Sequence, residues 1–351
     1  MRTLVAIAIL LAGATALHAA EAPPVLVYPC ERVAAPPVVD GRLDDAAWEK
    51  AALVSGFTYH DRRELVPVQT AFRVVYDAQA LYVGVRCEEP LWQKMVPGAP
   101  GMRDTHGAVF GGEAIELFID PKHNHSDYYQ IAANSDATLF DGKGTDSAWN
   151  SRAKVATRIS EGGWSLEIAL PWTDFEVRPE PGLVIGFNVC RDRNIAPDKL
   201  WSTWAPIAAN FHDPLRFGHL VLSATPEMIG RLGDEFRKGG LAGPIRVFAA
   251  EGFSGTTYLA LAARSLETLE ATLKELDSLR QQEKSPAVAA ALAKRIAAAR
   301  EMTAPIAVKV KGNQAFDAAE WVRADSQMQQ LRLELEKAVW NARLEALLSG
   351  I

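Results

Sequence analysis

Between residues 25 and 223, hydrophobic and polar residues alternate over short runs, which is the pattern of half-buried β-strands. Glycine and proline separate the runs, and Glu161-Gly162-Gly163 between two of them predicts a hairpin. Short strands at this spacing predict a mainly β fold, an antiparallel β-sandwich of the immunoglobulin-like or jelly-roll kind. We expect strands at residues 69–76, 81–87, 113–120, 127–134, 137–141, 154–160, 164–170, 183–192 and 216–223.

After Pro226 the hydrophobic pattern takes the period of a helix. Apolar residues, namely five leucines and Ala262, recur every three or four residues from 259 to 276, which predicts one long helix. A second helix is expected to begin at Pro286 and to run through residue 300, and a third covers 315–348. These helices predict a C-terminal α-helical bundle or helical hairpin, which either packs on the protein itself or binds a partner or a second copy. The expected domains are therefore a β-sandwich at 25–223 and a helical domain at 226–351.

The first twenty residues have the pattern of a secretory signal peptide. Arg2 supplies a positive charge, residues 4–12 are apolar but too few to cross a bilayer, and residues 16–20 are small enough for cleavage. No later apolar run is long enough to span a membrane. We therefore expect a periplasmic or secreted protein.

Composition and charge narrow the classes of partner. The chain is 48% hydrophobic and 23% charged, which suits a folded core. It has 37 Lys and Arg against 43 Asp and Glu, and this net charge of −6 argues against nucleic acid, which needs a basic surface. Cys30, Cys87 and Cys190 allow one disulfide and match no zinc spacing, and the latter two lie in strand-like runs where buried thiols are expected.

Polar residues in two strand-like runs form the centre of a candidate site. A period of two places Glu116 on the face opposite the apolar residues at 115, 117 and 119. Gln130 and Asn134 share one face of the next run. If the two strands are neighbours, these three side chains form a polar floor suited to sugar hydroxyls, which both donate and accept hydrogen bonds. The alternative is that they face water.

A sugar site also needs an apolar wall, because the C–H face of a pyranose packs on aromatic rings. Three aromatic residues lie in polar or glycine-rich loops, where burial in the core is not the default expectation: Phe110, Trp149 and Phe211. Phe110 and Phe211 are therefore expected to stack on a sugar, and Glu116 and Gln130 to hydrogen-bond its hydroxyls. Glu113, Asn134 and Trp149 are further candidates at the rim.

Five segments in order along the chain resemble carbohydrate-binding module family 9 and its secreted bacterial relatives. The resemblance covers about residues 25–223 and not the helical tail, and it implies a sandwich that binds a mono- or oligosaccharide. Relatives often belong to polysaccharide-degrading systems, so a role in carbohydrate catabolism is implied as well. The segments are 39–48 (VDGRLDDAAW), 81–85 (LYVGV), 116–120 (ELFID), 163–171 (GWSLEIALP) and 213–222 (DPLRFGHLVL).

The resemblance also assigns roles to individual positions. The two tryptophans that clamp the sugar in the family match Phe110 and Phe211, so the stacking area is smaller here and the indole N–H is lost. The family's binding carboxylate matches Glu116, and its binding arginine falls near Gln130, so that charge is absent.

Family members can also bind a structural calcium ion. Oxygen ligands for it could come from either of two acidic segments, neither of which follows an EF-hand loop. No other cofactor is expected. The two sets are Asp120, Asn124 and Asp127, and Asp136, Asp141 and Asp146.

Three other functions remain open at this stage. A glycoside hydrolase needs two facing carboxyl groups, but Glu113 and Glu116 point to opposite faces of a strand. Nothing in the sequence pairs Glu167 or Asp192 with Glu116, so we expect no catalysis by this chain alone. A haem-binding sandwich would draw ligands from Met95, Met102 and His106, although no C-x-x-C-H motif is present. A scaffold with the tail as its partner surface is the third alternative.

Overall fold

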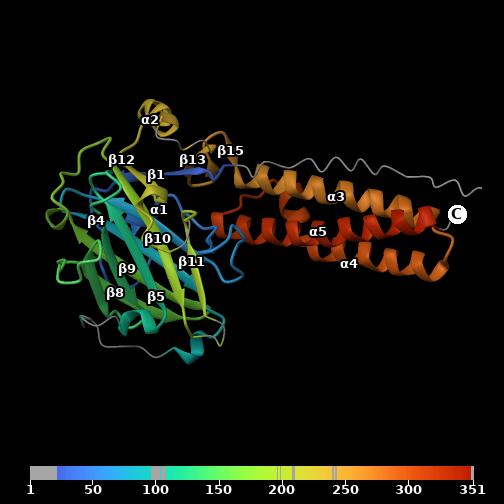
Figure 1. The fold of residues 1–351 in the computed structure, drawn as a ribbon, viewed down its shortest axis with the longest axis horizontal. Coiled ribbons are helices and arrows are strands. Elements are labelled where there is room, and N and C mark those ends of the chain that lie inside the picture. The colour runs from blue at the N-terminus through green and yellow to red at the C-terminus, as the bar shows by residue number, and fades with distance from the viewer. Residues whose placement is uncertain are drawn as a thin grey trace, which may run out of the picture.

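The computed structural model describes residues 22–95, 103, 108–195, 197, 199–207, 210–238, 241 and 243–348. The expected signal peptide at 1–20, Met102 and His106 lie outside these residues. Figure 1 shows a β part and a rod of long helices that extends away from it.

All nine expected strands are present in the β part, with ends shifted by a few residues. Three further strands, β1, β2 and β11, were not among the expected ranges. The strands are β1 (Val25–Arg32), β2 (Thr58–Tyr59), β3 (Thr70–Tyr76), β4 (Ala80–Glu88), β5 (Ala114–Asp120), β6 (Tyr129–Asn134), β7 (Leu139–Lys143), β8 (Lys154–Ser160), β9 (Gly163–Pro171), β10 (Val184–Arg193), β11 (Leu200–Thr203) and β12 (Gly218–Leu222).

The strands form two layers joined through β1. Their order is β7-β6-β5-β10-β12-β1-β3-β4-β9-β8. The middle of β1 pairs with β12, through Cys30 opposite Leu222, and its last residues pair with β3, through Glu31 opposite Val75. Both pairings are parallel, so the sandwich is mixed and not purely antiparallel as expected. Alternation along a strand fixes which face a residue occupies but not the direction of the neighbouring strand.

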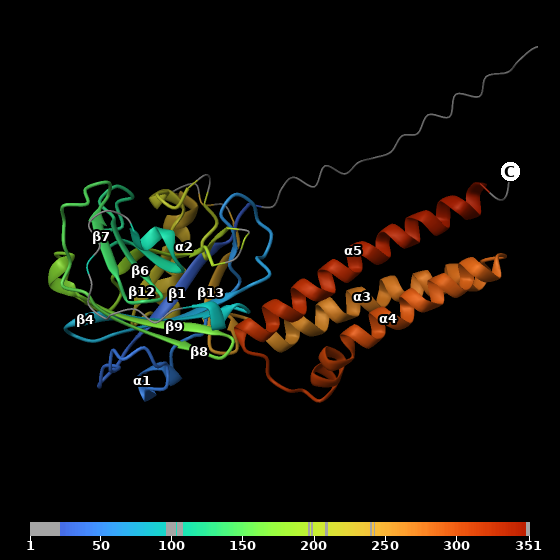
Figure 2. The same cartoon turned by 90° about the horizontal axis from the view of Figure 1, so that it is seen from below.

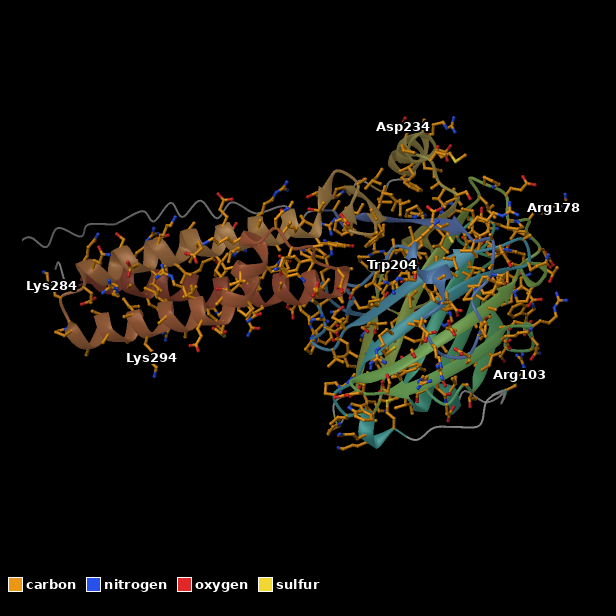
Figure 3. All side chains as sticks on the ribbon, turned by 180° about the vertical axis from the view of Figure 1, so that it is seen from behind. Arg103, Arg178, Trp204, Asp234, Lys284 and Lys294 are labelled. Atoms are coloured by element: carbon orange, nitrogen blue, oxygen red, sulfur yellow. The ribbon has the colours of Figure 1, made fainter. Side chains whose placement is uncertain are left out.

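The space between the layers is filled by apolar side chains from both. Ile115, Leu117 and Ile119 of β5 point into it, which confirms the expected alternation of that strand. Trp204 is 3% exposed and lies in the same core, where Figure 3 labels it within the β part. The three cysteines are buried and unpaired, and burial raises the pKa of each thiol above its usual value.

Beyond β12 the chain stays with the β part for longer than the expected boundary at 226. Helix α2 (Pro226–Lys238) is followed by β13 (Ile245–Ala249), which pairs in parallel with the start of β1. Strands β14 (Gly252–Phe253) and β15 (Thr256–Thr257) then lead into the rod. The four-residue helix α1 (Ala46–Glu49) packs on β3, and four 3₁₀ turns lie at Trp92–Lys94, Ala108–Gly111, Trp172–Asp174 and Pro214–Arg216.

The rod consists of three long helices, as the sequence predicts. They are α3 (Tyr258–Gln282), α4 (Pro286–Lys311) and α5 (Ala318–Leu348). The hydroxyl of Thr257 accepts a hydrogen bond from the N–H of Ala260 and so caps α3. Figure 2 shows α3 and α5 leaving the β part together, with α4 alongside. Leucines of α3 and α5 form a shared core.

The base of the rod is fixed to the β part by aromatic stacking. Trp321 of α5 stacks on Tyr258 with ring centroids 5.2 Å apart and meets Phe253 edge to face at 5.7 Å. Leu333, Trp340 and Leu344 of α5 are exposed. A second copy of the chain would have to pack on exposed apolar side chains such as these, and self-association through the tail stays a prediction. No helix among the described residues is both long and apolar enough to cross a membrane.

Candidate functional site

A cavity of about 470 Å³ opens over the outer face of β5, β6 and β10, the face turned away from the sandwich core. It collects four of the residues singled out from the sequence, namely Phe110, Glu116, Gln130 and Phe211. Its lining residues in full are His60, Phe110, Glu116, Gln130, Asp192, Trp201, Asn210, Phe211 and His212.

Glu116 lies at the centre of the cavity floor. Its direct cross-strand neighbours are Ala132 on β6 and Cys190 on β10. Both side chains are small, which leaves open space above the sheet at this point. Gln130 approaches diagonally from β6, and its Nε2 donates a hydrogen bond of 2.5 Å to Oε2 of Glu116. The expected neighbourhood of the two strands is therefore confirmed.

Asp192 approaches Glu116 diagonally from the other side, on β10. The two carboxyl groups are close enough to hydrogen-bond each other when one of them is protonated. Burial raises the pKa of Glu116 well above its usual range, and the negative charge of Asp192 raises it further. Burial also raises the pKa of Asp192. No local pattern pairs these two residues, because their contact depends on β10 lying beside β5.

Two phenylalanines stand on either side of this floor. The ring of Phe110 packs on a cluster that includes Ala114 and meets Phe140 edge to face at 5.0 Å. The ring of Phe211 packs against Phe118 at 6.3 Å. Ala114 and Phe118, the β5 residues of these two clusters, lie roughly 13 Å apart along the strand with Glu116 midway between them.

The loop that carries Phe110 is held in place by hydrogen bonds. Nδ2 of Asn194, just beyond β10, donates to the carbonyls of Phe110 and Gly112 at 3.0 and 2.9 Å. Val109, next to Phe110, is fully buried and anchors the turn in the cluster below. The ring is therefore a fixed wall of the cavity, because its own loop is pinned at both ends.

A third wall had not been identified from the sequence. Strands β2 and β11 pair with each other and bring His60 against Trp201, with ring centroids 5.4 Å apart. Trp201 is 44% exposed and lines the cavity, whereas Trp204 belongs to the core, so the two tryptophans do not share a face. His212 also lines the cavity, and its Nδ1 hydrogen-bonds the Tyr128 hydroxyl at 2.9 Å. The strands concerned are too short to show a periodic pattern.

The remaining sequence candidates lie elsewhere. Glu113 is buried beside Arg191 at 2.9 Å and accepts hydrogen bonds from two backbone N–H groups after β10. The side chain of Asn134 accepts the backbone N–H of Thr138 and stabilises a turn. Trp149 packs on Tyr129, with ring centroids 4.7 Å apart, beside the core. All three support the fold in this structure, and none lines the cavity.

The other candidate chemistries find little support in the described residues. Asp120 accepts two backbone N–H groups, and Asp141 is bound by Arg103 at 2.5 Å and by Ser151. Among the described residues no group of three or more His, Cys, Asp or Glu side chains could hold a metal ion. Met95 packs against the sandwich core. Glu167 lies on a different strand, β9, where it accepts a hydrogen bond from the indole N–H of Trp48.

The fold and the cavity define a β-sandwich binding domain with an aromatic-walled pocket on one sheet. Residues 39–225 match the family described as carbohydrate family 9 binding domain-like, and the chain belongs to that family. The family-level expectation from the sequence is therefore confirmed.

Curated relatives share this region. The chain is 28% identical over 196 residues to endo-1,4-beta-xylanase A of Thermotoga neapolitana, and 24% identical over 198 residues to exoglucanase XynX of Acetivibrio thermocellus. These matches cover 53% and 54% of this chain but only 17% of each enzyme.

Solved structures of carbohydrate-binding modules also resemble the chain, at lower sequence identity than the curated relatives. One is a family 9 carbohydrate-binding module from Caldicellulosiruptor kristjanssonii in complex with cellotriose, at 16% identity and a TM-score of 0.43, covering 57% of this chain and 95% of that one. Another is a family 9 carbohydrate-binding module from the same organism in complex with glucose, at 16% identity and a TM-score of 0.42, covering 58% of this chain and 97% of that one.

Proposed function

We propose that the cavity binds one sugar ring of a mono- or oligosaccharide between Phe110 and Phe211. The observation that carries the proposal is the placement of the two rings on either side of Glu116 in one cavity. Pyranose C–H faces pack on aromatic rings, and hydroxyls pair with buried carboxyl and amide groups. The family of the chain supports the same ligand class.

The floor suits hydroxyl groups because it offers both hydrogen-bond roles. Gln130 has an amide with donors and an acceptor, and the pair of Glu116 and Asp192 shares one proton between two carboxyl groups. A sugar hydroxyl that donates to one of these groups can accept from another. Such reciprocal pairing lowers the cost of burying the polar groups of the ligand.

We further propose that the protein acts outside the cytoplasm as an accessory to polysaccharide degradation. Its relatives include a xylanase and an exoglucanase, and the pattern of its first twenty residues is that of a signal peptide. We assign the carboxyl pair of the cavity to binding and not to catalysis, because Glu116 and Asp192 lie within hydrogen-bonding reach of each other, whereas retaining hydrolases separate their carboxyl groups by about 5 Å and inverting ones by more.

Binding is tested by calorimetry with cello- and xylo-oligosaccharides. We expect Phe110→Ala and Glu116→Ala each to weaken binding at least tenfold while the far-ultraviolet circular dichroism stays unchanged. Trp340→Ala is the control, because it removes a still larger aromatic side chain that is 67% exposed on α5. Undiminished affinity in both cavity variants would show that the sugar binds elsewhere.

A further inference from the structure

The fixed charges of the cavity have one sign. Glu116 and Asp192 lie in its floor, and none of the described residues that line it is Lys or Arg. The guanidinium groups of Arg191 and Arg193 on β10 point to the opposite face, where Arg191 contacts Glu113 at 2.9 Å and Arg193 contacts a second buried glutamate at 2.7 Å. Among the described residues that line the cavity, none places a permanent positive charge beside the two carboxyl groups.

Two carboxyl groups placed in this way need a proton or another cation to balance their negative charge. Two buried carboxylates in contact repel each other, and a shared proton removes one of the two charges. A protonated amine brings a full positive charge and three N–H donors to the same place, so it can displace that proton. The aromatic walls add to the attraction, because the faces of Phe110, Phe211 and Trp201 are electron-rich.

We propose that the preferred ligand is an amino sugar, whose protonated amine lies against Glu116 and Asp192 while its ring packs between Phe110 and Phe211. This inference rests on the proposed function, because it names the ligand class of the same cavity. A neutral sugar leaves the carboxyl pair without a countercharge, and a uronic acid brings a like charge to it. The affinity of the cavity should therefore be highest for a ligand that places an amine against the carboxyl pair. It should be lower for a hydroxyl or amide at that position and lowest for a carboxylate.

Other titratable groups around the pair act in the same direction as pH falls. His60 faces Asp192 and favours its ionised form, whereas Glu113 disfavours it. His212 lies on the far wall, and burial lowers its pKa. Protonation of His212 or of the carboxyl pair makes the cavity less negative. Binding of a cationic sugar should therefore weaken below neutrality, while binding of a neutral sugar should change little.

Three disaccharides that differ only at C2 isolate the amine. They are the β-1,4-linked disaccharide of glucosamine, cellobiose, and the N,N′-diacetylated form of the first, which carry an ammonium, a hydroxyl and a neutral amide. Calorimetry at pH 7.0 in two buffers of different ionisation enthalpy gives both the affinity and the number of protons released. We expect the glucosamine disaccharide to bind about tenfold more tightly than the other two, the value of one charge-assisted hydrogen bond. We also expect its binding alone to release protons from the carboxyl pair to the buffer.

Variants separate this site from general attraction between a basic ligand and an acidic protein. Asp192→Asn should reduce the affinity ratio of glucosamine disaccharide to cellobiose to about one. Glu334→Gln removes the same unit of charge from an exposed position on α5 and should leave the ratio unchanged. Proton release by the wild-type protein tests the inference even if Asp192→Asn does not fold.

The outcomes distinguish the inference from the function on which it rests. Equal affinities for the three disaccharides, or a preference that Asp192→Asn retains, would overturn the amine preference and leave sugar binding intact. Absence of binding by every member of this set and of the cello- and xylo-oligosaccharides would overturn both.

Discussion

Glu116 and Asp192 meet on the outer face of the sheet, where the carboxyl group of one hydrogen-bonds that of the other beneath three aromatic walls. Each is about 5% exposed. Buried carboxyl groups in contact destabilise a fold when both are charged, so a pair kept in this position opposes stability. A binding role accounts for the pair more readily than a structural one, because sites that recognise ligands often sacrifice stability.

The carboxyl pair makes stability depend on pH. Burial raises the pKa of Asp192 to about 6, so the folded state binds more protons than the unfolded state above the ordinary aspartate range. The free energy of unfolding should therefore fall as pH rises from about 4 through 6. Denaturant titrations at several pH values measure this slope in the wild-type protein.

Removing one charge of the pair should stabilise the protein. Glu116→Gln keeps an acceptor for Gln130 and ends the repulsion of Asp192, and we expect it to raise the free energy of unfolding at pH 7 by about 1–3 kcal/mol. The gain should vanish near pH 4, where the pair is protonated. Glu334→Gln is the control and should change the unfolding free energy by less than about 0.5 kcal/mol. A Glu116→Gln protein less stable than wild type at pH 7 would contradict the raised pKa.

Substitution of Glu113, three residues before Glu116, should lower the stability of the protein instead of raising it. Its carboxylate is the 2.9 Å partner of the fully buried Arg191, and Glu89 lies on the same guanidinium at 3.3 Å. Glu113→Ala leaves a buried cation with Glu89 as its single carboxylate partner, so we expect a loss of about 3 kcal/mol in the free energy of unfolding. Thermal denaturation of the Glu113 and Glu116 variants side by side provides the check. Equal effects of the two variants would mean that the ion pair is not formed.

The fold and the site differ in how far the sequence predicts them. Alternation along each strand is a local property, so it correctly placed Glu116 on the face opposite Ile115 and Leu117. The neighbourhood of β5 and β6 follows from their being consecutive strands. Contacts across non-consecutive elements have no such local signal, and Asp192 and Trp201 were therefore missed. The parallel pairing of β1 was missed for the same reason.

Trp201 should report occupancy of the cavity. It is the only tryptophan among the described residues that line the cavity, and its ring is partly exposed to water. A ligand that excludes water from the ring should shift its emission to shorter wavelength, and we expect this shift to be saturable. Trp201→Phe should abolish the shift, whereas Trp340→Phe, on the exposed face of α5, should preserve it. A full shift in the Trp201→Phe protein would place the ligand away from the cavity.

The two phenylalanine walls can be enlarged as well as removed. Phe110 is half-buried and its loop is pinned by Asn194, so a larger ring at this position extends into the cavity and not into the core. We expect Phe110→Trp to increase the area that stacks on a sugar and to tighten binding about threefold to tenfold, the range of one aromatic contact. Calorimetry with the disaccharide that binds best measures the change. The matched control is Phe140→Trp, because Phe140 contacts the Phe110 ring edge to face but does not line the cavity. Tighter binding in the control alone, or weaker binding in Phe110→Trp with unchanged unfolding free energy, would show that Phe110 does not stack on the ligand.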